Sequence, residues 1–266
     1  MALEQAELTQ FLSAVIELSK DAGHRILEVY QSNFSVDFKT DNSPLTAADL
    51  ASHNCLVAGL AKLLPSYPIL SEESGTIPFA QRVTWDTFWL IDPLDGTKEF
   101  VKRNGEFTVN VALIHRHKPI LGVVYAPAQE LCYYAAYEQG AFRQIGHATP
   151  EEITVQYPAH NPLRVVGSRS HSGAELQDYL RQLGEYQLIV SGSSLKFCRV
   201  AEGSADLYPR LAPTSEWDTA AAHAIVQEAG GAVVDLHRKE LRYNTKESLL
   251  NPYFIAFGDQ SRRWVL

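Results

Sequence analysis

The 266-residue sequence has little cysteine, no long apolar segment and no signal-peptide pattern. Cys55, Cys132 and Cys198 are far apart and show no CxxC spacing, so neither a disulfide framework nor a zinc site is expected. No segment has the roughly 18 consecutive apolar residues of a membrane-spanning helix, and the acidic N-terminus is unlike a signal peptide. We therefore predict a cytoplasmic protein without a transmembrane segment; peripheral association with the inner membrane stays open.

The sequence also lacks an excess of basic charge. It contains 23 Lys and Arg residues against 31 Asp and Glu residues, which gives a formal net charge of −8. Because proteins that bind nucleic-acid polymers neutralise many phosphates with a basic surface, DNA and RNA are not expected partners. A local basic pocket for a small anion is compatible with this charge.

Apolar periodicity predicts two helices at the start of the chain. One covers about residues 4–31, and the next begins after Thr46, where Thr46 and Asp49 have capping-box spacing. Short strands in "YPILSEES" and "TFWLID", the second ending at Asp92, come next. Four apolar runs then predict an antiparallel meander: "FTVNVALI", "PILGVVYAP", "LCYYAAY" and "AFRQI".

The pattern changes after a proline-containing boundary at about residues 147–162, because strands and helices then alternate, which is typical of an α/β unit. We predict an α/β (α+β layered) fold built from two halves. The N-terminal α+β half, residues 1–147, would carry metal and phosphate motifs. The C-terminal α/β half, residues 148–266, would carry substrate-recognition residues.

Acidic residues gather where predicted strands end and predicted helices begin: Asp49, Glu72, Glu73, Asp92, Asp95 and Asp218. Taken singly, each has a simpler interpretation. Asp49 with Thr46 and Asp218 with Ser215 have capping-box spacing, "DG" is common in turns, and a Glu-Glu pair suits a solvated loop. Taken together they indicate a site, because α/β folds bind ligands at strand ends. Clustered carboxylates repel one another, so we expect cations there.

The residue types at this site favour phosphate chemistry. Oxygen ligands without histidine or cysteine favour Mg²⁺ or Mn²⁺ over zinc. Beside them, "DGTKEF" places Gly96 and Thr97 at a predicted helix start, where main-chain N–H groups bind anions. Divalent metals beside an anion site indicate a phosphate substrate.

These motifs carry a resemblance to a known family over nearly the whole chain. In this order, "EES", "DPLDGT" and "EWDTAAAHAIVQEAGG" resemble the three signatures of the inositol monophosphatase superfamily, which contains Mg²⁺-dependent, lithium-sensitive phosphomonoesterases. Within it, "DPLDGTKEF", "NGEFTVN", "GSSLKF" and "LYPR" are most similar to bacterial 3′(2′),5′-bisphosphate nucleotidases. The resemblance implies a sugar-phosphatase-like fold of alternating helix and sheet layers (αβαβα), with the metal site between the two halves.

The resemblance also implies residue roles. The metals, two or three Mg²⁺ with Mn²⁺ as a substitute, would be held by Glu72, Asp92, Asp95, Asp218 and the main-chain carbonyl of Leu94. Thr97 and Asp49 would orient the attacking water and help to deprotonate it. Glu73 would assist a further metal or its water. The N–H groups of Gly96 and Thr97 would hold the phosphate.

A wider set of residues is expected to contact the substrate: Asp95, Gly96, Thr97, Lys98, His171, Ser193, Lys196, Arg210 and Asp218. Nucleotide-type members use cations such as His171, Lys196 and Arg210 for a second phosphate, which a monophosphate substrate lacks. An arginine suits bidentate phosphate contacts, and a lysine acts as a point charge. A lone cation also has the simpler interpretation of a surface charge.

The expected reaction is hydrolysis of the 3′-phosphate of adenosine 3′,5′-bisphosphate to AMP and phosphate, in sulfur assimilation. The related 3′-phosphoadenylyl sulfate is a second expected substrate, and the protein is expected to be a monomer or homodimer. Three alternatives stay open. One is an inositol or fructose phosphatase with the same metal site. A haloacid-dehalogenase phosphatase is disfavoured, because its DxD signature is absent from "DPLD". A non-catalytic nucleotide binder is disfavoured, because every position at which the resemblance implies a metal ligand carries a suitable residue.

Overall fold

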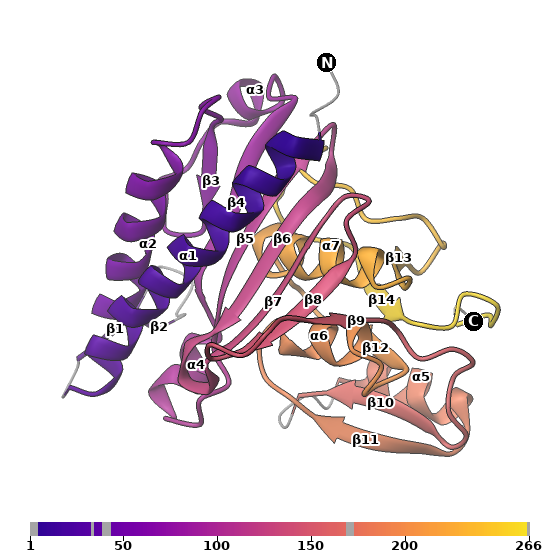
Figure 1. Ribbon diagram of the computed structural model, residues 1–266. Coiled ribbons are helices and arrows are strands. Elements are labelled where there is room, and N and C mark those ends of the chain that lie inside the picture. Colours follow the sequence, from indigo (N-terminus) through magenta and orange to yellow (C-terminus); the bar gives the residue numbers. More distant parts are fainter. Residues whose placement is uncertain (1–4, 33–34, 39–43, 169–172, 265–266) are drawn as a thin grey trace.

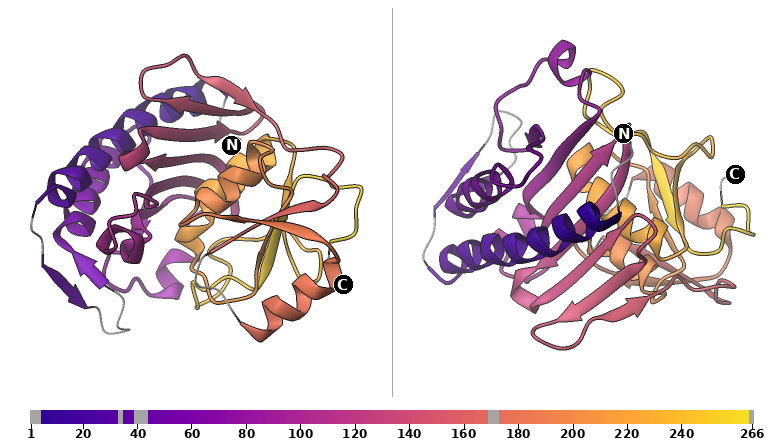
Figure 2. Two further views of the ribbon diagram at one scale, coloured as in Figure 1. Left: turned by 90° about the horizontal axis from the view of Figure 1, so that it is seen from below. Right: turned by 45° about the horizontal axis from the view of Figure 1, so that its top comes forward.

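Helices and sheets alternate in layers in the computed structural model, which describes residues 5–32, 35–38, 44–168 and 173–264 (Figure 1). Helices α1 (Gln5–Tyr30) and α2 (Ala47–Leu60) cover one face of a seven-stranded sheet. Helices α6 (Leu195–Ala201) and α7 (Ala220–Glu228) lie between this sheet and a five-stranded sheet (Figure 2). Helix α5 (Ala174–Leu183) packs outside the second sheet. The predicted αβαβα layering is confirmed.

The larger sheet has the order β3-β4-β5-β6-β7-β8-β9. Its strands are β3 (Ile69–Ser71), β4 (Thr87–Asp95), β5 (Thr108–His115), β6 (Lys118–Ala126), β7 (Leu131–Ala136), β8 (Ala141–Ile145) and β9 (Glu151–Ile153). Strand β3 pairs in parallel with β4, and the remaining neighbours are antiparallel. The predicted meander therefore forms the body of this sheet.

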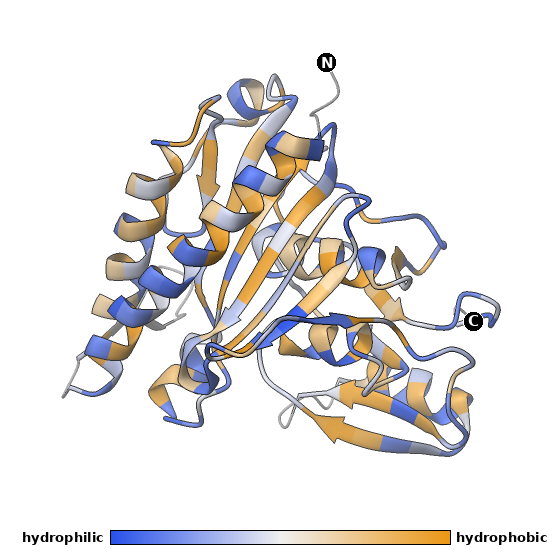
Figure 3. Ribbon diagram, in the orientation of Figure 1, coloured by the Kyte–Doolittle hydropathy of each residue, from blue (hydrophilic) through white to orange (hydrophobic). Residues whose placement is uncertain are grey.

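Helices on both faces explain why β4 is apolar without alternation. Phe88 and Leu90 pack in the core shared with α6 and α7, whereas Trp89 and Ile91 pack in the core shared with α1 and α2. A strand buried on both faces places an apolar side chain at every position. The exposed positions of α1 carry mostly hydrophilic residues, which alternate with hydrophobic ones along this helix (Figure 3).

The smaller sheet has the order β11-β10-β12-β14-β13. Its strands are β10 (Leu163–Gly167), β11 (Tyr186–Val190), β12 (Leu207–Arg210), β13 (Ala232–Asp235) and β14 (Phe254–Phe257). Strands β10, β11 and β12 are parallel, so their carboxyl ends meet at one edge. Arg210 lies at the end of β12 on that edge.

Several short elements were not predicted: β1 (Val36–Phe38), β2 (Pro44–Thr46), α3 (Phe79–Arg82) and β9. Strand β4 also continues to Asp95, three residues beyond the predicted end at Asp92. The division into two halves at residues 147 and 148 stays a prediction. Within the described ranges, no helix combines the length and apolar character needed to cross a membrane.

Candidate active site

Three carboxylates converge where β3 ends beside Asp92 of β4. The two strands run in parallel with Ser71 opposite Ile91, and the Glu72 N–H donates to the Ile91 carbonyl at 3.2 Å. Glu72 therefore follows β3 at the level where Asp92 follows Ile91. Asp218 approaches from the 3₁₀ turn η2 (Glu216–Asp218). Carboxylate oxygens of Glu72, Asp92 and Asp218 all lie within 4.8 Å of one another.

A break in the pairing of β4 with β5 places Asp95 on the same site. Asp92 pairs with Asn110 and Asp95 with Thr108, so the register shifts between them. The Leu94 N–H donates to Asp92 Oδ1 at 3.0 Å and stabilises this bulge. A bulge redirects side chains near active sites, here so that a second β4 carboxylate faces the cavity.

Asp95 connects strand β4 with the start of helix α6. The N–H of Ser194, at the start of α6, donates to Asp95 Oδ2 at 2.6 Å. From β5, Thr108 Oγ1 and Asn110 Nδ2 reach the same oxygen at 3.4 and 3.5 Å. These donors stabilise the ionised carboxylate and fix its direction.

The Thr97 hydroxyl lies between Asp49 and the main chain of β4. Thr97 Oγ1 is 3.3 Å from Asp49 Oδ1 and 3.3 Å from the Leu94 carbonyl. The second Asp49 oxygen accepts from the Thr46 N–H and hydroxyl, both at 2.7 Å, in a complete capping box. The helix-cap interpretation and the Thr97 contact therefore hold together, because each uses a different carboxylate oxygen.

Gly96 allows a close approach of the main chain after β4 to Ser193. Its φ of 87° lies in the left-handed region, and a Cβ there would be 2.0 Å from Ser193 Oγ. The Ser193 hydroxyl lies 3.0 Å from the Asp95 carbonyl and 2.7 Å from the Glu106 carbonyl. No other residue type combines this backbone conformation with this contact.

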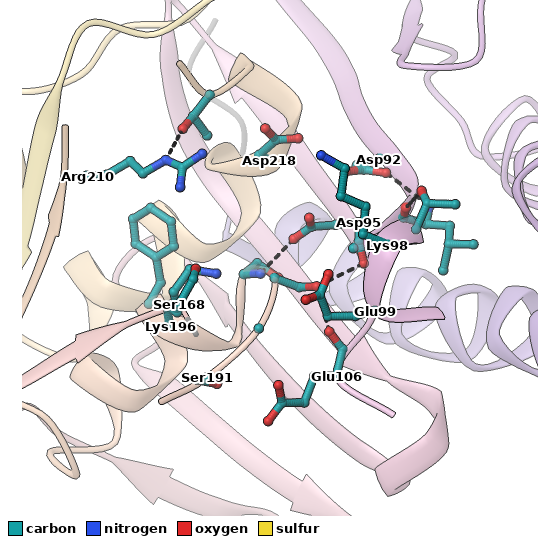
Figure 4. A pocket seen from close by; sticks show the side chains of 18 of the residues that line it. Asp92, Asp95, Lys98, Glu99, Glu106, Ser168, Ser191, Lys196, Arg210 and Asp218 are labelled. Atoms are coloured by element: carbon teal, nitrogen blue, oxygen red, sulfur yellow. Dashed lines mark hydrogen bonds between the residues drawn. The ribbon is translucent and has the colours of Figure 1, made fainter. Parts of the chain in front are cut away.

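A cavity of about 510 Å³ is lined by the acidic groups and by the basic residues Lys98, Lys102, Lys196 and Arg210 (Figure 4). Lys196 is buried, with Nζ 5.7 Å from the centre of the Tyr208 ring. Burial lowers the pKa of Lys196 to about 8, against the opposing effect of Asp95. Arg210 is held at the cavity wall, where Nε donates to Thr214 Oγ1 at 2.6 Å. One cavity thus presents carboxylates and cations side by side.

Comparison with known proteins identifies the family. Residues 7–259 match the Inositol monophosphatase family. The chain belongs to this family. It is 51% identical over 245 residues to the 3′(2′),5′-bisphosphate nucleotidase CysQ of Escherichia coli K12, covering 91% of this chain and 98% of the relative. The Haemophilus influenzae protein of the same name is 38% identical over 254 residues, covering 95% and 94%.

Solved structures of the inositol monophosphatase family share the fold. CysQ from Bacteroides thetaiotaomicron has a TM-score of 0.84 at 44% identity, covering 94% of this chain and 98% of that one. An inositol monophosphatase from Thermotoga maritima has a TM-score of 0.76 at 25% identity, covering 94% and 92%. The layered architecture is therefore that of the family.

The carboxylate cluster fits the divalent metals that phosphatases of this family use. Burial, followed by the charge of Glu72, raises the pKa of Asp92 well above its ordinary value. Burial, followed by the charges of Asp95 and Glu72, raises the pKa of Asp218 to about 8. Ionised carboxylates this close need a compensating charge, and an all-oxygen donor set suits a hard divalent cation.

The cavity brings together most of the predicted site residues: Glu72, Asp92, Leu94, Asp95, Gly96, Thr97, Lys98, Ser193, Lys196, Arg210 and Asp218. Of the described residues predicted for the site, Asp49 and Glu73 do not line it. Asp49 contacts it through Thr97, whereas the Glu73 N–H lies 3.3 Å from Ser71 Oγ. His171 falls outside the described residues. The individual roles stay predictions.

Sequence reasoning missed three polar residues that position charged groups. Asn110 is a polar residue inside the apolar run "FTVNVALI", which is a usable signal. Ser194 acts through its main-chain N–H, which residue type does not reveal. Thr214 bonds Arg210 only because the chain turns between them.

Proposed function

We propose that the protein is a Mg²⁺-dependent 3′(2′),5′-bisphosphate nucleotidase that converts adenosine 3′,5′-bisphosphate to AMP and phosphate. The carrying observation is that the Glu72, Asp92 and Asp218 cluster shares one cavity with Lys196 and Arg210. An acidic cluster alone suits any phosphatase of the family. Lys196 and Arg210 in the same cavity suit a substrate with a second phosphate, as the names of the CysQ relatives also indicate.

Two or three Mg²⁺ ions, or Mn²⁺ as a substitute, would be held by Glu72, Asp92, Asp95, Asp218 and the Leu94 carbonyl. When bound, such ions polarise phosphate oxygens and lower the pKa of water. Glu73 would assist a further ion or its water.

Asp49 and Thr97 would prepare the attacking water. The Thr97 hydroxyl donates to Asp49 Oδ1, which leaves the threonine oxygen able to accept a hydrogen bond from water. As the water attacks phosphorus, it would pass a proton to the Thr97 oxygen while the Thr97 hydroxyl proton passes to Asp49. The bond from phosphorus to the 3′-oxygen breaks, and that oxygen takes a proton from solvent and leaves as the 3′-hydroxyl. The N–H groups of Gly96 and Thr97 would bind phosphate oxygens, with Lys98 and Ser193 beside them. Lys196 and Arg210 would contact the phosphate that is not cleaved.

A phosphate-release screen tests this proposal. The panel is adenosine 3′,5′-bisphosphate, 3′-phosphoadenylyl sulfate, 3′-AMP, inositol 1-phosphate and fructose 1,6-bisphosphate, each with Mg²⁺ and with EDTA. We expect the highest kcat/KM for adenosine 3′,5′-bisphosphate, activity on the sulfated relative and none in EDTA. Preference for inositol 1-phosphate would instead assign the protein to the inositol monophosphatases.

Further properties are proposed on the family resemblance. Lithium should inhibit by competing for a metal position, and activity that is unaffected by lithium at the Mg²⁺ concentration used would contradict this. A role in sulfur metabolism, a cytoplasmic location and a monomeric or homodimeric state stay predictions from the sequence.

A further inference from the structure

Arg210 is held on two sides by the turn that follows it. Its Nε donates to Thr214 Oγ1 at 2.6 Å, and its Nη2 donates to the Pro213 carbonyl at 2.9 Å. Because the guanidinium is planar and rigid, two contacts to one short turn fix the orientation of the group. Figure 4 shows Arg210 at the cavity wall, with a dashed line that marks a hydrogen bond of its side chain.

The Thr214 hydroxyl is itself oriented to accept from Arg210. Thr214 Oγ1 donates its single proton to the Ala212 carbonyl at 3.2 Å, which directs its lone pairs toward Arg210 Nε. The Thr214 carbonyl accepts from the Asn251 N–H at 2.8 Å, and Asn251 Nδ2 donates to the Ser215 carbonyl at 2.8 Å. The turn is therefore anchored independently of Arg210.

Such an anchor is needed because the cavity contains opposite charges. Burial raises the pKa of Asp95, and the charges of Lys196 and Arg210 act against this effect. An arginine side chain is long and has several rotatable bonds. In a cavity with Asp95 and Asp218, a guanidinium without these hydrogen bonds would be attracted toward the carboxylates. There it would compete with the metals and leave the second phosphate without its cation.

We propose that Thr214 is a positioning residue that holds Arg210 ready for the phosphate that is not cleaved. Thr214 thereby helps to select bisphosphates over monophosphates. This inference rests on the proposed function, because it takes the substrate to be a nucleotide with two phosphates.

The test compares Thr214→Val, which keeps the shape and removes the hydroxyl, with Thr214→Ser, which keeps the hydroxyl. Arg210→Ala and the Thr214→Val/Arg210→Ala double variant complete the set. The measurement is kcat and KM with adenosine 3′,5′-bisphosphate and with 3′-AMP, which lacks the uncleaved phosphate, after thermal melts have established that each variant is folded.

We expect Thr214→Val to raise KM for the bisphosphate by about three- to tenfold, the effect of one lost hydrogen bond, with kcat and the 3′-AMP values unchanged. Thr214→Ser should restore KM to within about twofold of the wild type. The double variant should be no worse than Arg210→Ala, because the two residues act as a unit.

Two results would overturn the inference alone. The first is a Thr214→Val enzyme with wild-type KM while Arg210→Ala is impaired. The second is an equal loss on both substrates, which would mean that Thr214 shapes the turn leading to Asp218 rather than Arg210. A wild-type enzyme without preference for the bisphosphate over 3′-AMP would overturn the proposed function and this inference with it.

Discussion

Substitution of Gly122 by alanine tests whether the packing of α7 sets the position of Asp218. Gly122 lies on β6, where a Cβ would be 2.1 Å from the carbonyl oxygen of Ala221 and 2.8 Å from its carbonyl carbon. Carbon–oxygen contacts below 3.0 Å are avoided, so the helix or the strand must move by at least 0.9 Å. Because these are helix main-chain atoms, no side-chain rotation relieves the overlap.

Overpacking of this kind lowers the free energy of unfolding by about 1–3 kcal/mol, or the melting temperature on the order of 2–10 °C. The effect on Mg²⁺ affinity should exceed what this loss of stability alone would cause, because α7 begins two residues after Asp218. Displacement of metal-site support commonly weakens metal affinity by about 10- to 100-fold. We therefore expect Gly122→Ala to raise the Mg²⁺ concentration for half-maximal phosphate release by about tenfold or more.

Two control variants separate the effects. Gly23→Ala overpacks α1 against Tyr125, with a Cβ 2.5 Å from the ring, and α1 carries none of the proposed metal ligands. It should lower the melting temperature and leave the Mg²⁺ dependence unchanged. Gly75→Ala meets no atom within 4 Å and should change neither. Wild-type Mg²⁺ dependence in Gly122→Ala, or an equal shift in Gly23→Ala, would refute the reasoning.

Three further predictions concern individual polar residues. Asp92→Asn should abolish phosphate release and the thermal stabilisation by Mg²⁺. In EDTA at pH 8 the variant should melt no lower than the wild type, because the substitution removes a buried carboxylate that neighbouring carboxylates repel. Near-normal activity in saturating Mg²⁺ would contradict the assignment of Asp92 as a metal ligand. Thr97→Val and Asp49→Asn should each lower kcat strongly, and the double variant should be little worse, whereas additive losses would limit Asp49 to helix capping. Burial lowers the pKa of His223 to about 4, so below pH 6.5 the unfolded chain binds a proton that the folded chain does not. The contribution of His223 to the free energy of unfolding is complete above about pH 7.5, and about 2 kcal/mol of it is lost by pH 5. In urea unfolding, the free energy of unfolding of His223→Gln should therefore fall between these pH values by about 2 kcal/mol less than that of the wild type. An equal fall in both proteins would contradict the lowered pKa of His223.

Local patterns in the sequence predicted the elements that carry the site. Both capping boxes, Thr46 with Asp49 and Ser215 with Asp218, are present as their spacing indicated. The sequence of β4 does not show which side chains face which layer of helices. Both faces are buried, so apolar and polar residues do not alternate along the strand. The predicted end of β4 at Asp92 is three residues too early, because a bulge lets the strand continue through Pro93 to Asp95.

Contacts between distant segments could not be predicted in this way. No motif in the sequence marks Arg82, yet its side chain is buried. Its partners Asn244 and Glu247 are 162 and 165 residues further along the chain. Neither periodicity nor motif spacing reports a pairing over that separation.

This buried network explains how a repelling carboxylate cluster keeps its geometry. Arg82 Nη1 donates to Asn244 Oδ1 at 2.5 Å, and the Asn244 N–H donates to Glu216 Oε2 at 2.7 Å. Arg82 belongs to the segment that follows Glu72, and Glu216 begins the turn that ends at Asp218. The mutual repulsion of the carboxylates favours their separation. Hydrogen bonds outside the cluster oppose this separation, because they join the turn that carries Asp218 to helix α3, which ends ten residues after Glu72.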